Sequence, residues 1–552
     1  MFTDARSIAA DSTLQADICI VGAGIAGISI AREFIGRSES VVLLEGGGLE
    51  FTKSLRDLPT VLRRHTLGEQ ALASGQNAGQ PYYPLRFTRV RAFGGSSRAW
   101  HERRGVHARP LDSIDFGTRD GLPDHGWPID RAKLDPFYER AQQLCALGPF
   151  AYDATTWEAQ GYGAPLPLDP ELVKSVIFQF GKRSKFDRYK DDFARAENVN
   201  LVLYATAVHV ADRGGRVVRM DCATLSGNRF SVHARTFVLA AGAIETARLL
   251  LVSRDSQPAG IGNNRDLVGR SFMEHPDAAV GYLIPDPQLD RSAFRLYEHQ
   301  RAGKDVMVEA MFRLSDSVLR TERLLNAVLR LRPTHRSGMT AAVQSAQVIR
   351  RSVHHGVATP GLARHALRTM LGAPQILRHY ATSRSGRPPD VFGIDVMAEQ
   401  APTMSSRVRL ARRRDRLGVP MTVLDWRLTS MDWGSIRRTV EVFGDAVRKA
   451  GVGTVISTLG KHPPAVFGNW HHLGTTRMHH DPAHGVVDEN CRVHEMTNLY
   501  IAGGSVFPTG GYANPSLTIV ALSLRLADHL KSTSARSGNS TRFAGAVFQR
   551  SL

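Results

Sequence analysis

Cysteine is scarce in this sequence, which has only four among its 552 residues. They stand far apart and include no Cys-x-x-Cys pair, the spacing that redox and zinc sites favour: Cys19, Cys145, Cys222 and Cys491. We therefore expect neither a disulfide framework nor a zinc site built on cysteine.

Long apolar stretches are also missing. No window approaches the roughly 20 consecutive apolar residues that a membrane-spanning helix requires. The first residues show no basic segment followed by an apolar run, so they do not have the pattern of a secretory signal. The sequence accordingly predicts a cytoplasmic protein without a transmembrane segment.

Acidic residues are outnumbered by basic ones. The chain has 52 Asp and Glu against 70 Lys and Arg, a formal net charge of +18, and a pI near 10.1. Such a charge favours acidic partners or a membrane surface, and it can also follow from genome composition. Its basic residues are not interleaved with aromatic side chains as in proteins that read single strands, so no nucleic-acid partner is expected.

The most informative stretch of the sequence lies near its start. An apolar run without polar alternation, typical of a parallel strand buried on both faces, precedes spaced glycines, a helical pattern, a second apolar run and an acid. These segments are Ile18–Val21, Gly22-x-Gly24-x-x-Gly27, residues 28–37, Val41–Leu44 and Glu45. Together they form the βαβ fingerprint of a dinucleotide site.

Each residue type of the fingerprint has a physical role. Gly22 permits the tight turn, Gly24 lets the backbone approach a pyrophosphate, and Gly27 lets the helix pack against the strand. The helix N-terminus offers N–H groups to the pyrophosphate. Glu45 stands where a carboxylate can bind a pair of ribose hydroxyls. The motif alone does not separate NAD from FAD.

Two later segments repeat the glycine pattern. Gly94-Gly95-Ser96-Ser97, followed closely by Trp100, offers small residues that let the backbone approach a ligand. The apolar run Thr236–Leu239 leads into Ala240-Ala241-Gly242 and a helical pattern over residues 244–251. This strand-to-glycine turn predicts a second stretch of backbone facing a phosphate.

The C-terminal part of the chain holds the second informative region. Asn514 is a good N-cap and Pro515 suits the first helical position, so a helix is expected from there to about Leu530. The positive end of that helix would point at whatever lies before it. Upstream lie the adjacent histidines His471 and His472, and an apolar strand over residues 499–502 that runs into Gly503-Gly504-Ser505.

These motifs resemble the glucose–methanol–choline (GMC) oxidoreductases, which use FAD to oxidise alcohols and sugars. The resemblance runs from the Gly22 turn through the Gly94–Ser97 segment to Asn514, and it is closest to the sugar- and polyol-oxidising branch. It implies an α/β (α+β overall) fold: a Rossmann-like FAD-binding domain, and a second domain built on a mainly antiparallel sheet covered by helices.

The resemblance also implies an active-site pair. The family's His-x-x-Gly-Thr pattern falls on His471 and its Ala-Asn-Pro pattern on Asn514. An alcohol gives hydride to flavin N5 only as its hydroxyl loses a proton, and a base with a pKa near 6.5 suits that step. The second polar group would orient the same oxygen. In an extended segment His472 would face the opposite way, which suggests a structural or secondary role.

A set of small and polar residues around these motifs is expected to hold the FAD. The predicted cofactor residues are Gly22, Gly24, Ile25, Ala26, Gly27, Glu45, Gly46, Arg91, Gly94, Gly95, Ser96, Ser97, Trp100, Ala207, Val208, Ala241, Gly242, Gly504, Ser505, Asn514, Pro515 and Ser516. Some family members bind FAD covalently through a histidine beside the glycine-serine loop; here His101 follows Trp100, not precedes it, and the linkage is left open.

Composition suggests where the domains divide. We assign residues 1–276 and 461–532 to a discontinuous FAD-binding domain and residues 277–460 to a substrate-binding domain. Residues 1–15 read as a polar lead-in, residues 49–85 as an excursion over the nucleotide site, and residues 533–552 as a disordered tail. Within the second domain, residues 314–389 are rich in Arg and His, with apolar residues at helical spacing, including Leu324, Val328 and Leu331.

This basic segment is interpreted as a helical insertion that covers the substrate entrance or docks an electron-accepting partner, and that does not build the flavin site. Peripheral contact with a membrane would pass through it. Its simpler interpretation is a set of solvated basic faces.

Several functions compete at this stage. The first is oxidation of a CH–OH group of a sugar, aminosugar or polyol, with O2 or a partner protein as electron acceptor; a steroid or other hydrophobic alcohol is the alternative substrate. A nicotinamide dehydrogenase and a non-catalytic flavoprotein are further candidates. A metal-binding protein is a further candidate, with the late histidines as ligands: His471, His472, His479, His480, His484 and His494. The sequence has no HExxH helix, so no metal is expected. Taken alone, His471 could be a core histidine bonded to backbone.

Overall fold

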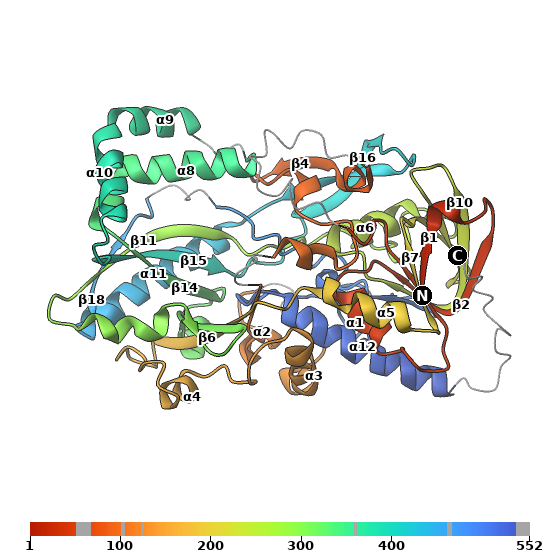
Figure 1. The fold of residues 1–552 in the computed structure, drawn as a ribbon, viewed down its shortest axis with the longest axis horizontal. Coiled ribbons are helices and arrows are strands. Elements are labelled where there is room, and N and C mark those ends of the chain that lie inside the picture. Colours follow the sequence, from red (N-terminus) through yellow and green to blue (C-terminus); the bar gives the residue numbers. More distant parts are fainter. Residues whose placement is uncertain are drawn as a thin grey trace.

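The computed structural model describes residues 1–50, 68–100, 105–122, 126–357, 359, 361–460 and 466–536. In these residues the chain forms three sheets (Figure 1). No helix in the described ranges combines the length and the apolar character needed to cross a bilayer.

The first sheet is parallel at its centre and carries the dinucleotide fingerprint. Its strands lie in the order β1-β7-β3-β2-β10-β9-β8, with β19 added alongside β10. They are β1 (Phe2–Asp4), β2 (Thr13–Val21), β3 (Val41–Leu44), β7 (Val199–Leu203), β8 (Thr206–Arg213), β9 (Arg216–Ala223), β10 (Arg229–Leu239) and β19 (Leu499–Ile501). Only the β8-β9-β10 pairings are antiparallel.

The second sheet is antiparallel throughout its described pairings. Its order is β18-β11-β15-β14-β13-β6-β5, with β12 beside β13. The strands are β5 (Val106–Ala108), β6 (Val173–Gly181), β11 (Asp277–Pro285), β12 (Gln300–Arg301), β13 (Val306–Leu314), β14 (Ala327–Thr334), β15 (Val391–Ala398) and β18 (Gly453–Ser457). Helix α11 (Ser430–Lys449) packs on this sheet with its buried face. The two sheets confirm the predicted fold class.

The remaining elements connect and cover the sheets. A small third sheet joins β4 (Gly75–Gly79), β16 (Arg407–Arg414) and β17 (Pro420–Trp426). The long α12 (Ser516–Arg536) packs against α1 (Ile25–Arg32) and α3 (Arg131–Leu144). The other helices are α2 (Ser113–Phe116), α4 (Ala154–Ala159), α5 (Lys190–Arg195), α6 (Ala243–Val252), α7 (Asp316–Thr321), α8 (Ala341–His355), α9 (Leu362–Leu371) and α10 (Ala373–Arg384).

Several segments differ from the sequence predictions. The lead-in at residues 1–15 supplies β1, which pairs with β7, and the start of β2. The excursion at residues 49–85 contains the short strand β4; residues 51–67 lie outside the described residues. Residues 327–334 are strand β14 and not helix, so β14 separates the short α7 from α8–α10 within the predicted helical insertion.

Two predicted boundaries also differ from the structure: the one at residue 276 and the one at residue 532. Strands β5 and β6 precede residue 276 yet belong to the second sheet, so the chain enters that sheet well before the predicted boundary. Helix α12 extends to Arg536, four residues into the segment predicted as disordered. It begins at Ser516, which leaves Pro515 before the first helical residue and Asn514 one position earlier. The rest of the predicted tail lies outside the described residues.

Candidate active site

A cavity of about 480 Å³ lies beside the carboxyl ends of the parallel strands. Its size falls within the roughly 300–1,000 Å³ common for small-molecule sites. The first residues of three helices line it: Ile25 and Ala26 of α1, Ala243 and Ile244 of α6, and Ser516 of α12. Helix N-termini carry unpaired N–H groups and a partial positive charge, so this cavity suits an anionic ligand.

The glycine turn at the start of α1 is tightly constrained. Gly22 has a φ of 104°, and a Cβ there would lie 2.7 Å from the carbonyl oxygen of Ala240. A Cβ at Gly27 would lie 1.9 Å from the carbonyl oxygen of Gly22, so this glycine allows helix and strand to pack as predicted. Gly24 lines the cavity with open space beside its Cα, which leaves backbone exposed to a ligand.

Glu45 lies at the end of β3, where the fingerprint predicts it. Its carboxylate accepts hydrogen bonds from the backbone N–H of Ala23 at 3.0 Å and of Gly47 at 2.8 Å. Burial raises the pKa of Glu45, opposed by Arg91 and these N–H groups. Arg91 donates to the Thr206 hydroxyl at 2.8 Å, and its Nε is buried without a hydrogen-bond partner among the described residues.

Most of the predicted cofactor residues line this cavity, and three do not. Gly27 and Gly94 shape the adjoining turns, and Ser505 lies buried behind Gly504, with its hydroxyl unpaired among the residues described. An ion network on the cavity wall was not foreseen: Arg89 and Glu245 lie 2.6 Å apart, and Arg248 bonds to Glu245 at 3.2 Å. His101 lies outside the described residues.

His471 lines the cavity and is held between two polar groups. Its Nε2 lies 3.1 Å from the amide nitrogen of Asn514, so the structure brings these two side chains together. Its Nδ1 lies 2.9 Å from Nδ1 of His275, and His275 Nε2 lies 2.9 Å from the carbonyl oxygen of Gly511. His275 was not singled out in the sequence. The His275 imidazole is buried, and His471 is partly exposed on the cavity wall.

These contacts assign the proton positions. A carbonyl oxygen only accepts, so His275 Nε2 carries a proton. Burial lowers the pKa of His275 to about 4, so the ring is neutral near pH 7 and its Nδ1 is unprotonated, with a lone pair that can accept a hydrogen bond. His471 must then donate its Nδ1–H to His275. Its Nε2 is left unprotonated, with its lone pair facing Asn514. Burial, followed by the field of His275, lowers the pKa of His471 well below its ordinary value.

Glu274 holds the backbone around the histidines. It is buried, and its Oε2 accepts from the backbone N–H groups of His275, Asn469 and His471 at 3.0–3.1 Å. Its Oε1 accepts from the Tyr82 hydroxyl. Burial raises the pKa of Glu274 to about 7 in spite of these hydrogen bonds, which act to lower it.

His472 faces this carboxylate instead of Asn514. Its Nε2 lies 2.9 Å from the Tyr82 oxygen. Because Tyr82 donates its own proton to Glu274, His472 must donate Nε2–H to Tyr82. Nε2 of His472 is therefore not available as a base, and the adjacent histidines have separate environments, as the extended segment predicts.

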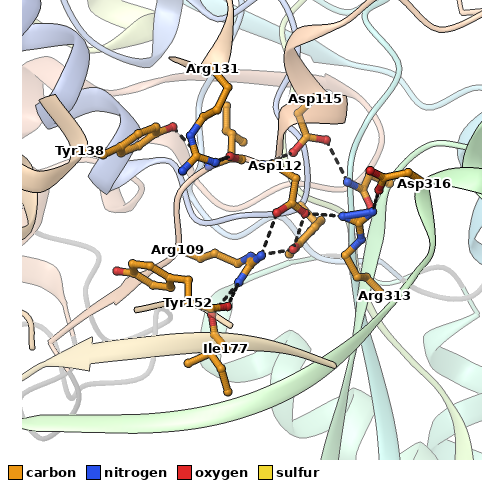
Figure 2. Close-up of polar contacts among 12 residues, drawn as sticks. Arg109, Asp112, Asp115, Arg131, Tyr138, Tyr152, Ile177, Arg313 and Asp316 are labelled. Atoms are coloured by element: carbon orange, nitrogen blue, oxygen red, sulfur yellow. Dashed lines mark hydrogen bonds and ion pairs between the residues drawn. The ribbon is translucent and has the colours of Figure 1, made fainter. Parts of the chain in front are cut away.

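A polar cluster around Arg109, Asp112 and Arg313 (Figure 2) holds Tyr512, in the loop that carries Gly511 and Asn514. The Tyr512 hydroxyl donates to Asp112 at 2.7 Å and accepts from Arg109 at 2.7 Å. Asp112 also accepts from Arg109 at 2.8 Å and from Arg313 at 2.7 Å. Burial acts to raise the pKa of Asp112, but the two guanidinium groups outweigh it and hold that pKa well below its ordinary value.

The histidines do not form a metal centre. No group of three or more His, Cys, Asp or Glu in the described part of the chain has metal-binding geometry. His479 and His484 pack ring to ring near the surface, and His494 Nε2 contacts the backbone oxygen of His479 at 3.0 Å.

Comparison with known proteins places this site in a family. Two models described as GMC oxidoreductase match the chain, one over residues 178–277 and one over residues 402–523. The chain is a GMC oxidoreductase. It is therefore an FAD-dependent enzyme that acts on CH–OH groups, as the sequence resemblance implied.

Curated relatives and solved structures agree with this assignment. The large subunit of fructose dehydrogenase from Gluconobacter japonicus is 24% identical over 94% of this chain and 98% of its own length. Paromamine 6'-oxidase from Streptomyces fradiae is 26% identical over 93% of this chain and 90% of its own. A variant formate oxidase from Aspergillus oryzae has a TM-score of 0.55 at 16% identity, covering 96% of this chain and 100% of that one, and so shares the fold.

The cavity of this GMC oxidoreductase fits FAD on its own features. The exposed backbone at Gly24 and the start of α1 suit the pyrophosphate, and the Glu45 carboxylate suits a ribose. Arg91 lines the same part of the cavity and adds a positive charge that suits the phosphates. His471 and Asn514 line the same cavity.

Proposed function

We propose that this GMC oxidoreductase oxidises a hydroxyl-bearing carbon of a sugar, aminosugar or polyol, with His471 Nε2 as the general base and Asn514 as the group that orients the substrate oxygen. The observation that carries the proposal is the chain Gly511–His275–His471–Asn514. It leaves an unprotonated Nε2 on His471 in contact with the Asn514 amide, and both residues line the cavity.

The residues around the cavity divide into two sets. We propose that the Gly22–Gly27 turn, Glu45 and Arg91 hold the nucleotide part of FAD. The segment Gly95–Trp100 and the start of α12 would surround the remainder. When bound, FAD accepts the hydride from the substrate carbon.

The side chains of the protein accept one proton from the substrate during the reaction. The substrate hydroxyl donates its proton to His471 Nε2, and the Asn514 amide donates a hydrogen bond to the oxygen on which charge develops. His471 then carries protons on both nitrogens, with Nδ1–H still donated to His275. Burial disfavours this cation, so the His471 ring is a base that readily passes its proton on.

Glu45 provides a test of the nucleotide site. Replacing Glu45 by alanine is expected to weaken FAD binding about 10- to 100-fold, the usual effect of losing a hydrogen bond to a charged group. Titrating apoprotein with FAD by fluorescence measures this. Glu45→Gln keeps one carbonyl oxygen and is expected to lose less. Equal affinity of wild type and Glu45→Ala would remove Glu45 from the cofactor site.

The substrate class follows from the relatives and is tested directly. Their names include a fructose dehydrogenase and an aminosugar oxidase. Anaerobic mixing of the purified holoenzyme with fructose, an aminosugar, a 1,2-diol and cholesterol should bleach the flavin band with one of the first three. Bleaching by cholesterol alone would assign a hydrophobic alcohol, and no bleaching by any hydroxyl compound would overturn the proposal. Air or an artificial acceptor then separates oxidase from dehydrogenase.

A further inference from the structure

Helices α8–α10 carry an unusual concentration of exposed apolar side chains. Among the described residues, ten large hydrophobic side chains are exposed, and seven of them lie in this segment: Val353, Leu362, Leu367, Met370, Leu371, Leu377 and Tyr380. Met370, Leu371 and Leu377 are 68%, 78% and 70% exposed. Apolar residues scattered singly over a surface need no explanation, whereas a cluster of them marks a contact surface.

The two outer helices, α9 and α10, have no fully buried side chain. Only Gly372 separates them. Figure 1 shows α8–α10 together at one corner of the molecule, with α9 outermost. On α9, Ala363, Leu367, Met370 and Leu371 recur at the i, i+4, i+7, i+8 spacing of one helix face. That face has no partner among the residues described.

The charges beside these apolar residues are all of one sign. Arg364, Arg368, Arg378 and Arg384 are exposed on α9 and α10, and the sequence has no Asp or Glu from residue 323 to residue 389. We call this surface, with Leu367, Met370, Leu371, Leu377 and Tyr380, the apolar-basic face. Two copies of it placed together would bring Arg against Arg, which disfavours a second copy as its occupant.

We propose that the apolar-basic face docks on an anionic lipid bilayer. Large apolar residues on one side of short helices, with Arg around them, are the composition that places a helix in the membrane interface. The apolar side chains would enter the boundary of the acyl chains, and the Arg side chains would reach the lipid phosphates. The proposal does not depend on the substrate or on the role of His471.

The face is held firmly to the enzyme. On α8, Arg351 pairs with Asp277 of β11 at 3.7 Å, and Gln344 donates to the Tyr282 hydroxyl at 3.3 Å. Asp277 exchanges backbone hydrogen bonds with Phe467 at 2.9 and 3.0 Å, four residues before His471. The docking face is therefore joined, through α8 and β11, to the segment that carries the proposed base.

Sedimentation with vesicles tests the proposal on the holoenzyme. Wild type is expected to bind vesicles of phosphatidylcholine with phosphatidylglycerol at low salt, at least about tenfold more tightly than vesicles of phosphatidylcholine alone, and to release them at high salt. Leu371→Glu with Leu377→Glu should abolish binding. Arg368→Gln with Arg378→Gln should weaken it by about fivefold for each Arg removed.

The matched control places the same charges on exposed apolar residues elsewhere. Val218→Glu with Ile456→Glu, at positions 41% and 42% exposed, should bind as wild type does. Flavin absorbance and turnover of all variants verify that they are folded. Failure of wild type to bind either vesicle, or undiminished binding by Leu371→Glu with Leu377→Glu, would overturn the proposal. A dimer that dissociates on introducing the same two changes would assign the face to a second copy and also overturn it.

Discussion

Replacing His471 by alanine is expected to leave FAD bound and to slow flavin reduction by the substrate about 10²- to 10⁴-fold, the usual contribution of a positioned general base. The reason is that His471 Nε2 is the one imidazole lone pair that the hydrogen-bond chain directs at Asn514. Anaerobic stopped-flow mixing measures the reduction step by itself. His472→Ala is the control, because its Nε2–H is already donated to Tyr82.

The pH dependence of the wild type checks the same assignment. Burial lowers the pKa of His471 well below 6.5, so the ring is neutral and competent through pH 6.5. The reduction rate at low substrate should therefore stay level as the pH falls through 6.5, and decline only at the lower pH where His471 gains a proton. A larger loss in His472→Ala than in His471→Ala would transfer the role of base to His472.

Replacing His275 by leucine is expected to slow the same step on the order of 10²-fold, although His275 touches no substrate. Leucine cannot accept the Nδ1–H of His471, so the ring is free to carry its proton on Nε2, where it cannot act as a base. His275→Asn should recover much of the rate, since the asparagine Oδ1 can occupy the position of the lost Nδ1 acceptor.

Nitrogen chemical shifts of histidine-labelled protein separate a positioning role from a packing role. In wild type, and in His275→Asn, the His471 signals should show a protonated Nδ1 and an unprotonated Nε2. In His275→Leu they should show a mixture of the two tautomers. An unchanged His471 tautomer in a slowed His275→Leu enzyme would reduce His275 to a packing residue.

The nucleotide half of the site could be predicted because its signals are local. Gly22 adopts a positive φ, and Gly27 approaches the carbonyl oxygen of Gly22 within the same motif. The contact of Gly22 with Ala240 is long range, but the motif is recognisable without it. The strand that ends in Glu45 follows in the same βαβ unit. Such a pattern can be recognised without knowledge of the rest of the fold.

The catalytic half was predicted less completely because its contacts are long range. His275 and His471 are 196 positions apart, and nothing near Glu274-His275 in the sequence indicates which backbone it will meet. The resemblance to a family provided His471 and Asn514, but not the residues that orient them. Distance along the chain also hides Asp112, which reaches Tyr512 over 400 positions.

Strand β14 was missed for a different reason. Val328 and Leu331 are three residues apart, which fits a helix face, but Leu329 is buried as well, and buried and partly exposed residues alternate only from there to Arg332. The strand is central, between β13 and β15, so both faces are covered and the period of two is weak. A short buried strand and a helix then look alike in sequence.

The order in which the first sheet is completed has a consequence for biosynthesis. Strand β10 receives β19 only at residues 499–501, and β1 must wait for β7, some two hundred positions later. A nascent chain that has not yet reached β19 also lacks Gly511, Tyr512 and Asn514. The hydrogen-bond chain that fixes the tautomer of His471 is then incomplete. The growing polypeptide must therefore keep the apolar strands β2, β3 and β10 from aggregating until β19 has been made. Loading of the cofactor is correspondingly a late event, and chaperones are expected to hold the unfinished enzyme until then.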